Sequence, residues 1–277
     1  MRFPSQEKLD FPQPRFLCIG AQKAGTTWLY QQLRTHPDFW FPPIKELHFF
    51  DYHYTPHNRQ WVPRMIKNAT EREINREAKH ERVSYIAKIT APLLSEQWYR
   101  AMFGARHAAG RICGDITPAY SMIDREGVEY AKRLLPDTKV LFIIRDPFTR
   151  AMSEARMMFT RPNRPEGRTL FGPNNDIKGL LARSSYSVSV SRWREVFGDN
   201  IHFVAFKRIA TEPLSVLAEI EKLNGARSWN YPKAQEAVYS SKTVEIPSDI
   251  SEYVQKELEP ERDFIVREFG AEFAAMT

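Results

Sequence analysis

The chain has 277 residues, of which 42% are hydrophobic, so it is long and apolar enough to bury a sizeable core. Its formal net charge of +6 fits an acidic ligand but is too small to indicate nucleic-acid binding by itself. No stretch is apolar for long enough to span a membrane, and the polar N-terminus lacks the apolar core of a signal peptide. We expect a soluble protein with one domain over residues 1–277, and with Cys18 and Cys113 as buried thiols rather than a disulfide.

A glycine loop between a predicted strand and a predicted helix is the first candidate site. Residues 16–20 form a short apolar run, which predicts a buried strand, and residues 25–35 predict a helix. The N–H groups of such a loop and the helix dipole attract anions, and Lys23 adds a full positive charge. The sequence therefore indicates an anion site, with a plain strand–turn–helix connection as the alternative.

The position of the lysine indicates which kind of anion is bound. Gly20 and Gly25 have the spacing of the nucleotide-triphosphatase phosphate loop, but Thr26 stands where that pattern has its lysine. The usual lysine reaches the β- and γ-phosphates of a nucleotide held with magnesium. Lys23 lies inside the loop instead, and with Thr26 and Thr27 behind it the loop suits a shorter anion that is gripped directly.

The remaining elements alternate between helices and strands. After a loop rich in proline and aromatic residues (36–57), the pattern predicts helices at 59–68, 71–82 and 92–103, a strand at 111–115, a helix at 127–135, a strand at 139–144, a helix from Asp146, a loop at 161–175, a helix at 184–197, a strand at 201–206, a helix at 211–223, and a last helical stretch at 249–269 that Pro260 should split. This alternation predicts an α/β fold with a parallel sheet flanked by helices. The phosphate-binding loop should lie at the carboxyl edge of that sheet.

A second candidate anion site follows the strongest predicted strand. Residues 139–144 end in an unbroken apolar run, which is typical of a strand buried on both faces, and Arg145 comes directly after it. Asp146 and Pro147 are suited to the N-cap and first position of a helix, and Ser153 lies about two helical turns further on. Arg145 and Ser153 are placed to hold a second phosphate. The alternative is that Asp146 only caps the helix and Arg145 only pairs at the sheet edge.

Two further segments carry polar groups. Glu46 and His48 lie in an aromatic stretch after two prolines, and we expect this apolar setting to raise the pKa of Glu46, which suits a general base. His48 is the competing base, and a solvated Glu46 with a packed His48 is the alternative. Residues 117–120, Thr-Pro-Ala-Tyr, follow a predicted strand and are a weaker candidate for a wall on the acceptor side.

Together these segments resemble the sulfotransferases that use 3′-phosphoadenosine 5′-phosphosulfate (PAPS), above all the group of the heparan sulfate enzymes and many bacterial enzymes. The matching segments, which run in the family's order from about residue 16 to 206, are Gln22-Lys23-Ala24-Gly25-Thr26-Thr27, Lys45-Glu46-x-His48-Phe49-Phe50, Thr117-Pro118-x-Tyr120, Arg145-Asp146-Pro147 through Arg150 and Ser153, and Tyr186 with Arg192-Trp193. Two departures stand out. Ile116 replaces a lysine that assists catalysis in several carbohydrate sulfotransferases, and residues 240–242 lack the glycine of the family's closing loop.

The resemblance implies a role for each candidate residue. The residues implied to bind the donor are Lys23, Ala24, Gly25, Thr26 and Thr27 for the 5′-phosphosulfate, Trp28 near the nucleotide, Arg145 and Ser153 for the 3′-phosphate, and Tyr186, Ser241 and Lys242 as further contacts. Glu46 would take the proton from an acceptor hydroxyl or amine, with His48 as the second candidate, while Lys23 would assist the departing phosphate. No metal is required, and neither nucleic acid nor a membrane span is expected.

The acceptor and the location are less well defined. Basic and aromatic residues in the 52–64 stretch, and Arg161, Arg164 and Arg168, fit a sugar or acidic glycan and equally an aromatic small molecule. By resemblance we expect a carbohydrate acceptor. From the missing signal-peptide core and membrane span we expect a cytoplasmic protein, or one of the Golgi lumen if the sequence is the trimmed part of an anchored enzyme. The alternative functions are a phosphate-loop kinase that uses ATP and magnesium, and a non-enzymatic nucleotide- or polyanion-binding module.

Overall fold

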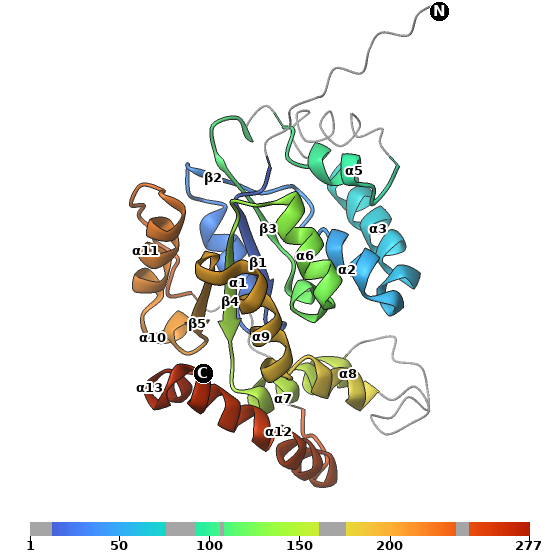
Figure 1. Ribbon diagram of the computed structural model, residues 1–277, viewed down its shortest axis with the longest axis vertical. Coiled ribbons are helices and arrows are strands. Elements are labelled where there is room, and N and C mark those ends of the chain that lie inside the picture. Colours follow the sequence, from blue (N-terminus) through green and yellow to red (C-terminus); the bar gives the residue numbers. More distant parts are fainter. Residues whose placement is uncertain (1–12, 76–91, 106–107, 161–175, 237–243) are drawn as a thin grey trace, which may run out of the picture.

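A computed structural model describes residues 13–75, 92–105, 108–160, 176–236 and 244–277. Five parallel strands form one sheet in the order β2-β3-β1-β4-β5 (Figure 1). The strands are β1 (Phe16–Gly20), β2 (Phe39–Trp40), β3 (Ile112–Ile116), β4 (Lys139–Ile144) and β5 (Ile201–Ala205). With the helices around this sheet, the predicted α/β fold is confirmed.

Burial explains why the apolar runs became central strands. Every residue of β1 and β3 is buried, and so is every residue of β4 after Lys139. Strands covered on both faces favour apolar side chains, and β1 and β4 have that pattern, whereas β3 buries the hydrogen-bonded carboxylate of Asp115. Because β1 and β4 are parallel neighbours, the loop after Gly20 and the residues after Ile144 leave the sheet at the same edge.

The helices enclose the sheet and extend past its carboxyl edge. They are α1 (Thr26–Leu33), α2 (Phe49–Tyr54), α3 (Val62–Asn75), α5 (Glu96–Ala101), α6 (Arg125–Leu134), α7 (Pro147–Phe159), α8 (Asp176–Ala182), α9 (Tyr186–Phe197), α10 (Arg208–Thr211), α11 (Pro213–Asn224), α12 (Ser248–Phe269) and α13 (Ala271–Ala275). In Figure 1, α6 and α9 cross in front of the sheet, while α7, α8 and α12 lie below the end of β4. No helix within the described ranges is both long and apolar enough to cross a bilayer.

The 36–57 stretch holds more regular structure than the sequence predicted. Its proline and aromatic content suggested a loop, but it contains β2 and α2. Phe49 and Phe50 in α2 are almost fully buried, and Phe49 stacks on Tyr99 with ring centroids 4.4 Å apart. The short helix is therefore held by aromatic packing from distant parts of the chain, which local sequence patterns do not register.

Pro260 does not split the last helix, so that prediction is wrong. α12 runs without a break from Ser248 to Phe269. Val254 and Ile265, on either side of the proline, are buried, and the Glu261 carboxylate accepts hydrogen bonds from the N–H and hydroxyl of Ser187 at 2.7 Å each. These contacts hold both halves of the helix in place and compensate for the hydrogen bond that proline removes.

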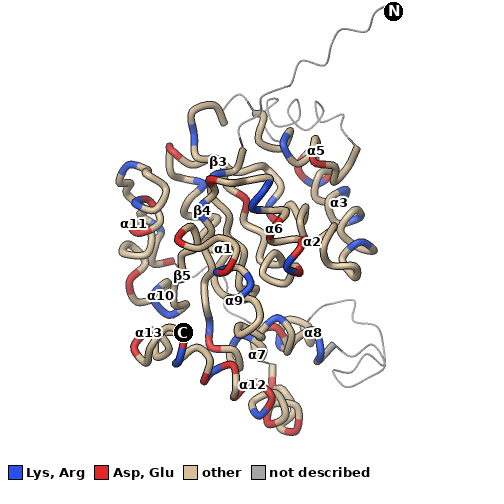
Figure 2. The backbone as a smooth tube through the Cα atoms, viewed as in Figure 1, with Lys and Arg blue, Asp and Glu red and all other residues tan. Residues whose placement is uncertain are grey.

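Cys18 and Cys113 are free and buried, as predicted. In Figure 2 basic and acidic residues are both scattered over the helices, and this view shows no single basic stripe. The net positive charge therefore does not locate a binding site, and the individual cations at the sheet edge must be considered one at a time.

Candidate active site

The first candidate anion site is the open N-terminus of α1. Gly25 is its N-cap, with a left-handed φ of 80°; no side chain caps the helix, and its first turn contains no acidic residue. The first N–H groups of a helix have no partners within it, so they are available here to an external acceptor. The left-handed φ favours glycine here, and a Cβ would in addition lie 2.9 Å from Ile209 Cδ1, so the end of that side chain would have to shift.

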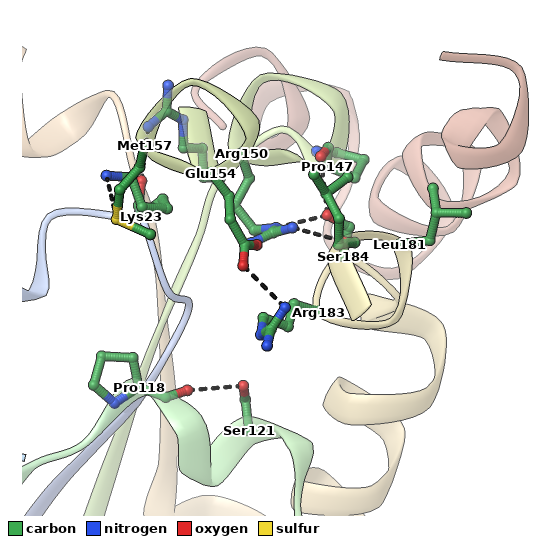
Figure 3. A network of polar contacts seen from close by, with 12 residues as sticks. Lys23, Pro118, Ser121, Pro147, Arg150, Glu154, Met157, Leu181, Arg183 and Ser184 are labelled. Carbon is green, nitrogen blue, oxygen red and sulfur yellow. Dashed lines mark hydrogen bonds and ion pairs between the residues drawn. The ribbon is translucent and has the colours of Figure 1, made fainter. Parts of the chain in front are cut away.

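The two predicted anion sites meet at Lys23 and Arg145. Arg145 Nη1 donates to the carbonyl of Lys23 at 2.7 Å, and the guanidinium lies over the ring of Phe206, 4.5 Å from its centroid. The Lys23 ammonium lies 3.8 Å from the sulfur of Met157 on α7, as Figure 3 shows. Lys23 itself has a φ of 70°, so the loop backbone is held in a conformation that costs a non-glycine residue energy.

The start of α7 has the capping predicted from the sequence. Asp146 Oδ1 accepts the N–H of Thr149 at 2.8 Å, with Pro147 at the first helical position. Arg262 of α12 donates to the other Asp146 oxygen at 2.7 Å. Ser153 is buried on α7. The hydroxyl of Tyr186 on α9 accepts a long hydrogen bond, 3.4 Å, from the Arg145 N–H, so Tyr186 also lies at this corner.

Arg150, in the same motif, points away from the site and fixes α7 in place. It is fully buried and donates to Ser184 Oγ at 2.6 Å, Glu154 Oε2 at 2.8 Å and the Leu180 carbonyl at 2.7 Å (Figure 3). Arg183 donates to the second Glu154 oxygen at 2.9 Å. Arg150 therefore stabilises α7, the helix that carries Ser153 and directly follows Arg145, and its full burial keeps it from a ligand in the cavity.

An open cavity of about 970 Å³ lies beside Arg145. One wall is the face of α7 that carries Thr149, Met152 and Arg156; the other is formed by residues 244–248 and Ser251 at the start of α12. The cavity gives Arg145 room for a ligand group on its outer side. Arg156 was not singled out from the sequence, because only the helix face it shares with Thr149 connects it to the site.

Glu46 lies in a compact charged group before α2. Lys45 Nζ is 2.5 Å from Glu46 Oε1, and His48 Nε2 is 3.5 Å from Glu46 Oε2. His48 Nδ1 is in turn 2.8 Å from Oδ2 of the fully buried Asp51. Glu46 and His48 both have left-handed φ values, 66° and 51°, and such strain in non-glycine residues is concentrated at functional sites.

The expected rise in the pKa of Glu46 is wrong. Burial does act to raise it, but the hydrogen bond from His48 and the charge of Lys45 outweigh burial and lower the pKa of Glu46 to about 2. For His48, burial acts to lower the pKa, but the hydrogen bonds to Asp51 and Glu46 raise the pKa to about 9. At neutral pH the pair is therefore a carboxylate and an imidazolium, and the aromatic surroundings do not decide its charge state.

The Thr117–Tyr120 segment is joined to the Glu46 group through a buried carboxylate. The Tyr120 hydroxyl accepts the N–H of Phe49 at 3.2 Å and donates to Asp115 Oδ2 at 2.7 Å. Thr117 and Tyr99 also donate to Asp115. Burial raises the pKa of Asp115 to about 6 despite these bonds. This arrangement fixes the backbone just after Glu46 against the carboxyl end of β3.

Trp28 anchors a distant segment rather than leaving its polar edge free for a nucleotide. Its indole N–H donates to the carbonyl of Ala234 at 2.8 Å. Two more side chains, each four residues further along, bond carbonyls of the same segment: Gln32 Nε2 bonds that of Lys233 at 3.2 Å, and His36 Nε2 bonds that of Arg227 at 2.9 Å. We call residues 226–236 the strap. Ser241 and Lys242, and the arginines of 161–175, lie outside the described residues.

Sequence reasoning missed Asp51 and Asn58. Asp51 bonds His48, and Asn58 Nδ2 donates to the same Asp51 oxygen at 2.7 Å. The signal that could have found Asp51 is its three-residue spacing from His48, because the residue before a helix and the third residue of that helix commonly bond each other. No local pattern marks Asn58, which reaches Asp51 from the 3₁₀ turn at Pro56–Gln60.

Heparan sulfate sulfotransferases are among the curated proteins that this chain resembles. Heparan sulfate glucosamine 3-O-sulfotransferase 6 of Homo sapiens is 25% identical over 221 residues, which cover 77% of this chain and 53% of that protein. Heparan sulfate glucosamine 3-O-sulfotransferase 5 of Mus musculus is 27% identical over 221 residues, covering 76% and 52%. The chain thus spans about half the length of the curated relatives it matches.

Solved structures share the fold. A sulfotransferase from Alicyclobacillus acidocaldarius superposes with a TM-score of 0.63 at 20% identity, covering 92% of this chain and 95% of that one. The sulfotransferase domain of the Synechococcus PCC 7002 olefin synthase gives a TM-score of 0.53 at 18% identity, covering 84% and 79%. The model of the sulfotransferase family matches residues 14–230, which include the loop after β1, the Glu46 group and the start of α7. The chain belongs to the sulfotransferase family.

Proposed function

We propose that this protein transfers a sulfuryl group from PAPS to a hydroxyl or amine of an acceptor, and that the acceptor is a carbohydrate. The observation that carries the proposal is the contact between the Lys23 carbonyl and Arg145, which joins two cationic sites at one sheet edge. A donor with a phosphosulfate at one end and a phosphate at the other needs two such sites. A ligand with a single anionic group would leave one of them unused.

The residues present fit the donor. The N-terminus of α1 offers N–H groups with no acidic side chain in its first turn, so Lys23, Ala24, Gly25, Thr26 and Thr27 would hold the phosphosulfate. Arg145 and Ser153 would hold the 3′-phosphate, with Tyr186 supporting Arg145 through its N–H. Ser241 and Lys242 are proposed as further contacts on resemblance alone.

Proton transfer falls to Glu46. The bound donor supplies a sulfur–oxygen bond that breaks as the acceptor oxygen or nitrogen bonds to sulfur, leaving adenosine 3′,5′-bisphosphate. Glu46 receives the acceptor's proton, and Lys23 with the α1 N–H groups stabilises the charge that develops on the departing oxygen. His48, protonated at neutral pH, holds the Glu46 carboxylate by a hydrogen bond and so acts as its orienting partner rather than as the base.

The low pKa of Glu46 affects the point in the reaction at which this carboxylate accepts the proton. A carboxylate of pKa about 2 is always ionised at neutral pH but is a weak base. It removes a proton readily only after the acceptor atom has become acidic by bonding to sulfur. Glu46 therefore acts late in the transfer, and it orients the acceptor hydroxyl before then.

The carbohydrate acceptor is proposed on two grounds. The curated relatives are named as sulfotransferases of heparan sulfate glucosamine. The 52–64 stretch next to Glu46 also exposes Arg59, Trp61 and Arg64, which suit a sugar that carries anionic groups.

Calorimetric titration tests the donor class. We expect adenosine 3′,5′-bisphosphate to bind without magnesium and the affinity to fall in Arg145→Ala. Tighter binding of ATP with magnesium would overturn the proposal in favour of a kinase. Transfer is tested with Glu46→Gln, which should bind the bisphosphate normally and lose about a hundredfold or more in rate. An unchanged rate in that variant would remove Glu46 as the base.

A further inference from the structure

An exposed tryptophan lies beside the proposed base. Trp61, which directly precedes α3, is 37% exposed, and its ring centroid lies 4.9 Å from that of His48. The same imidazole reaches Glu46 with its Nε2. The carboxylate and the indole are therefore neighbours of a single buried ring.

The orientation of the indole is fixed by the same hydrogen bonds that hold His48. Trp61 Nε1 donates to Asn58 Oδ1 at 3.1 Å, and the amide of Asn58 donates to Asp51, the partner of His48. The indole's only polar group is thus already satisfied, and what it offers to a ligand is a flat apolar face. An aromatic side chain that is already fixed loses little conformational entropy on binding.

The ring contact leaves that face open. The planes of Trp61 and His48 meet at 78°, so the two rings touch edge to face and do not stack. A nearly perpendicular contact covers at most one face of the indole, consistent with its exposure. Trp98 and Trp193 are buried, but Trp229 is exposed much as Trp61 is, so it is the fixed position beside His48, and not exposure alone, that singles out Trp61.

We propose that Trp61 is the platform for the acceptor ring. A pyranose would lie with its C–H face on the indole, which places a ring hydroxyl toward Glu46. This inference rests on the proposed function, and it adds a residue that positions the acceptor without touching the donor. No new covalent step is involved, because Trp61 takes no part in the transfer of the sulfuryl group or the proton.

Two substitutions of matched size separate stacking from packing. Trp61→Phe keeps a flat ring, whereas Trp61→Leu keeps an apolar side chain without one. With saturating PAPS and a heparan sulfate oligosaccharide as acceptor, we expect Trp61→Leu to raise the acceptor KM about five- to tenfold and Trp61→Phe about twofold, since aromatic stacking is worth roughly 0.5–1.5 kcal/mol. The KM for PAPS should not change. Trp229→Ala is the control, because Trp229 is a similarly exposed tryptophan (42%) on the strap.

A second readout needs no turnover. The protein has six tryptophans, and we expect the oligosaccharide to change the fluorescence of the bisphosphate-loaded protein in wild type and in Trp229→Phe but not in Trp61→Phe. Equal KM values for Trp61→Leu and Trp61→Phe, a fluorescence change that survives in Trp61→Phe, or no response of wild type to the oligosaccharide would each overturn the platform. Failure of the wild type to bind the bisphosphate would instead overturn the proposed function.

Discussion

The helices α1 and α7 both begin at the carboxyl edge of the sheet, but their N-termini are completed in opposite ways. No side chain caps α1, so its first N–H groups have no partner from the helix's own sequence. α7 is capped by Asp146, which is itself paired with Arg262. Two helix starts at one edge are therefore not two copies of one anion site.

The difference indicates how each site would bind its anion. At α1 the backbone is the binding surface, so the geometry of the Gly25 turn matters most. At α7 the Asp146 carboxylate already occupies the Thr149 N–H and adds a negative charge, so we expect binding to depend on the side chains of Arg145 and Ser153. The first site should tolerate no change of backbone and the second should tolerate no loss of charge.

The largest effect on stability is expected from Arg150, the buried arginine that fixes α7 in place. Arg150→Ala removes a buried guanidinium with three partners and leaves the Glu154 carboxylate with Arg183 alone. The free energy of unfolding, measured in urea, should fall by about 3–4 kcal/mol. Arg125→Ala is the control, since this arginine pairs with Glu129 and Glu195 on the surface, and its loss should not be measurable. Similar losses of unfolding free energy in the two variants would show that the buried contacts of Arg150 do not stabilise the protein as expected.

Gly25→Val tests the backbone site. A branched side chain at φ 80°, with Ile209 2.9 Å from its Cβ, must displace the loop. We expect the affinity for adenosine 3′,5′-bisphosphate to fall about a hundredfold, which corresponds to about 2.7 kcal/mol, and AMP affinity to fall equally. Gly110→Val is the control, because Gly110 has a similar φ of 73° with nothing within 4 Å. If Gly110→Val weakens binding as much, strain rather than the loop is responsible.

Arg145→Ala tests the side-chain site with the same two ligands. Loss of a charged hydrogen-bond partner costs about 2 kcal/mol, so we expect bisphosphate affinity to fall about thirtyfold. AMP, which has no 3′-phosphate, should bind within about threefold of wild type, a difference of less than 1 kcal/mol. An equal loss for AMP would mean that Arg145 acts through its bond to the Lys23 carbonyl and not on a phosphate.

Asp146→Ala should make α7 more like α1, with a small effect. Removing the cap costs about 1 kcal/mol of stability but frees the Thr149 N–H and removes a negative charge beside Arg145. We expect bisphosphate affinity in calorimetry to rise up to about threefold, or roughly 0.6 kcal/mol. Asp124→Ala removes the equivalent cap of α6, which bonds Gly127 N at 2.8 Å, and should lower stability alone. Weaker binding in Asp146→Ala would contradict the contrast between the two helices.

Elements with a strong local cause were predicted from the sequence. The apolar run of β4 and the Asp146–Pro147 helix start are decided by neighbouring residues, and the structure has them where expected. The continuity of α12 through Pro260 and the existence of α2 depend on partners far along the chain, and no local pattern contains them. Predictions failed where tertiary contacts outweigh local preference.

The residues of the candidate site likewise fall into those with a local sequence signal and those without one. Lys23, Glu46 and Arg145 were identified because each comes after a predicted strand or lies in a recognisable motif. The charge state of Glu46 was predicted wrongly, because its aromatic neighbours are visible in the sequence while the opposing effects of His48 and Lys45 depend on distances. Asn58 and Trp61 join the site only through a folded turn.

The hydrogen bonds to the strap couple the local opening of α1 to that of a segment far along the chain. Because Trp28, Gln32 and His36 hold three carbonyls of the strap, α1 and the strap should open and close as one cooperative unit, although some two hundred residues separate them in sequence. A ligand that stabilises the first turn of α1 shifts the opening equilibrium of the whole unit. Slow exchange of the strap's backbone amides with deuterium would then report, at a distance, whether the donor site is filled.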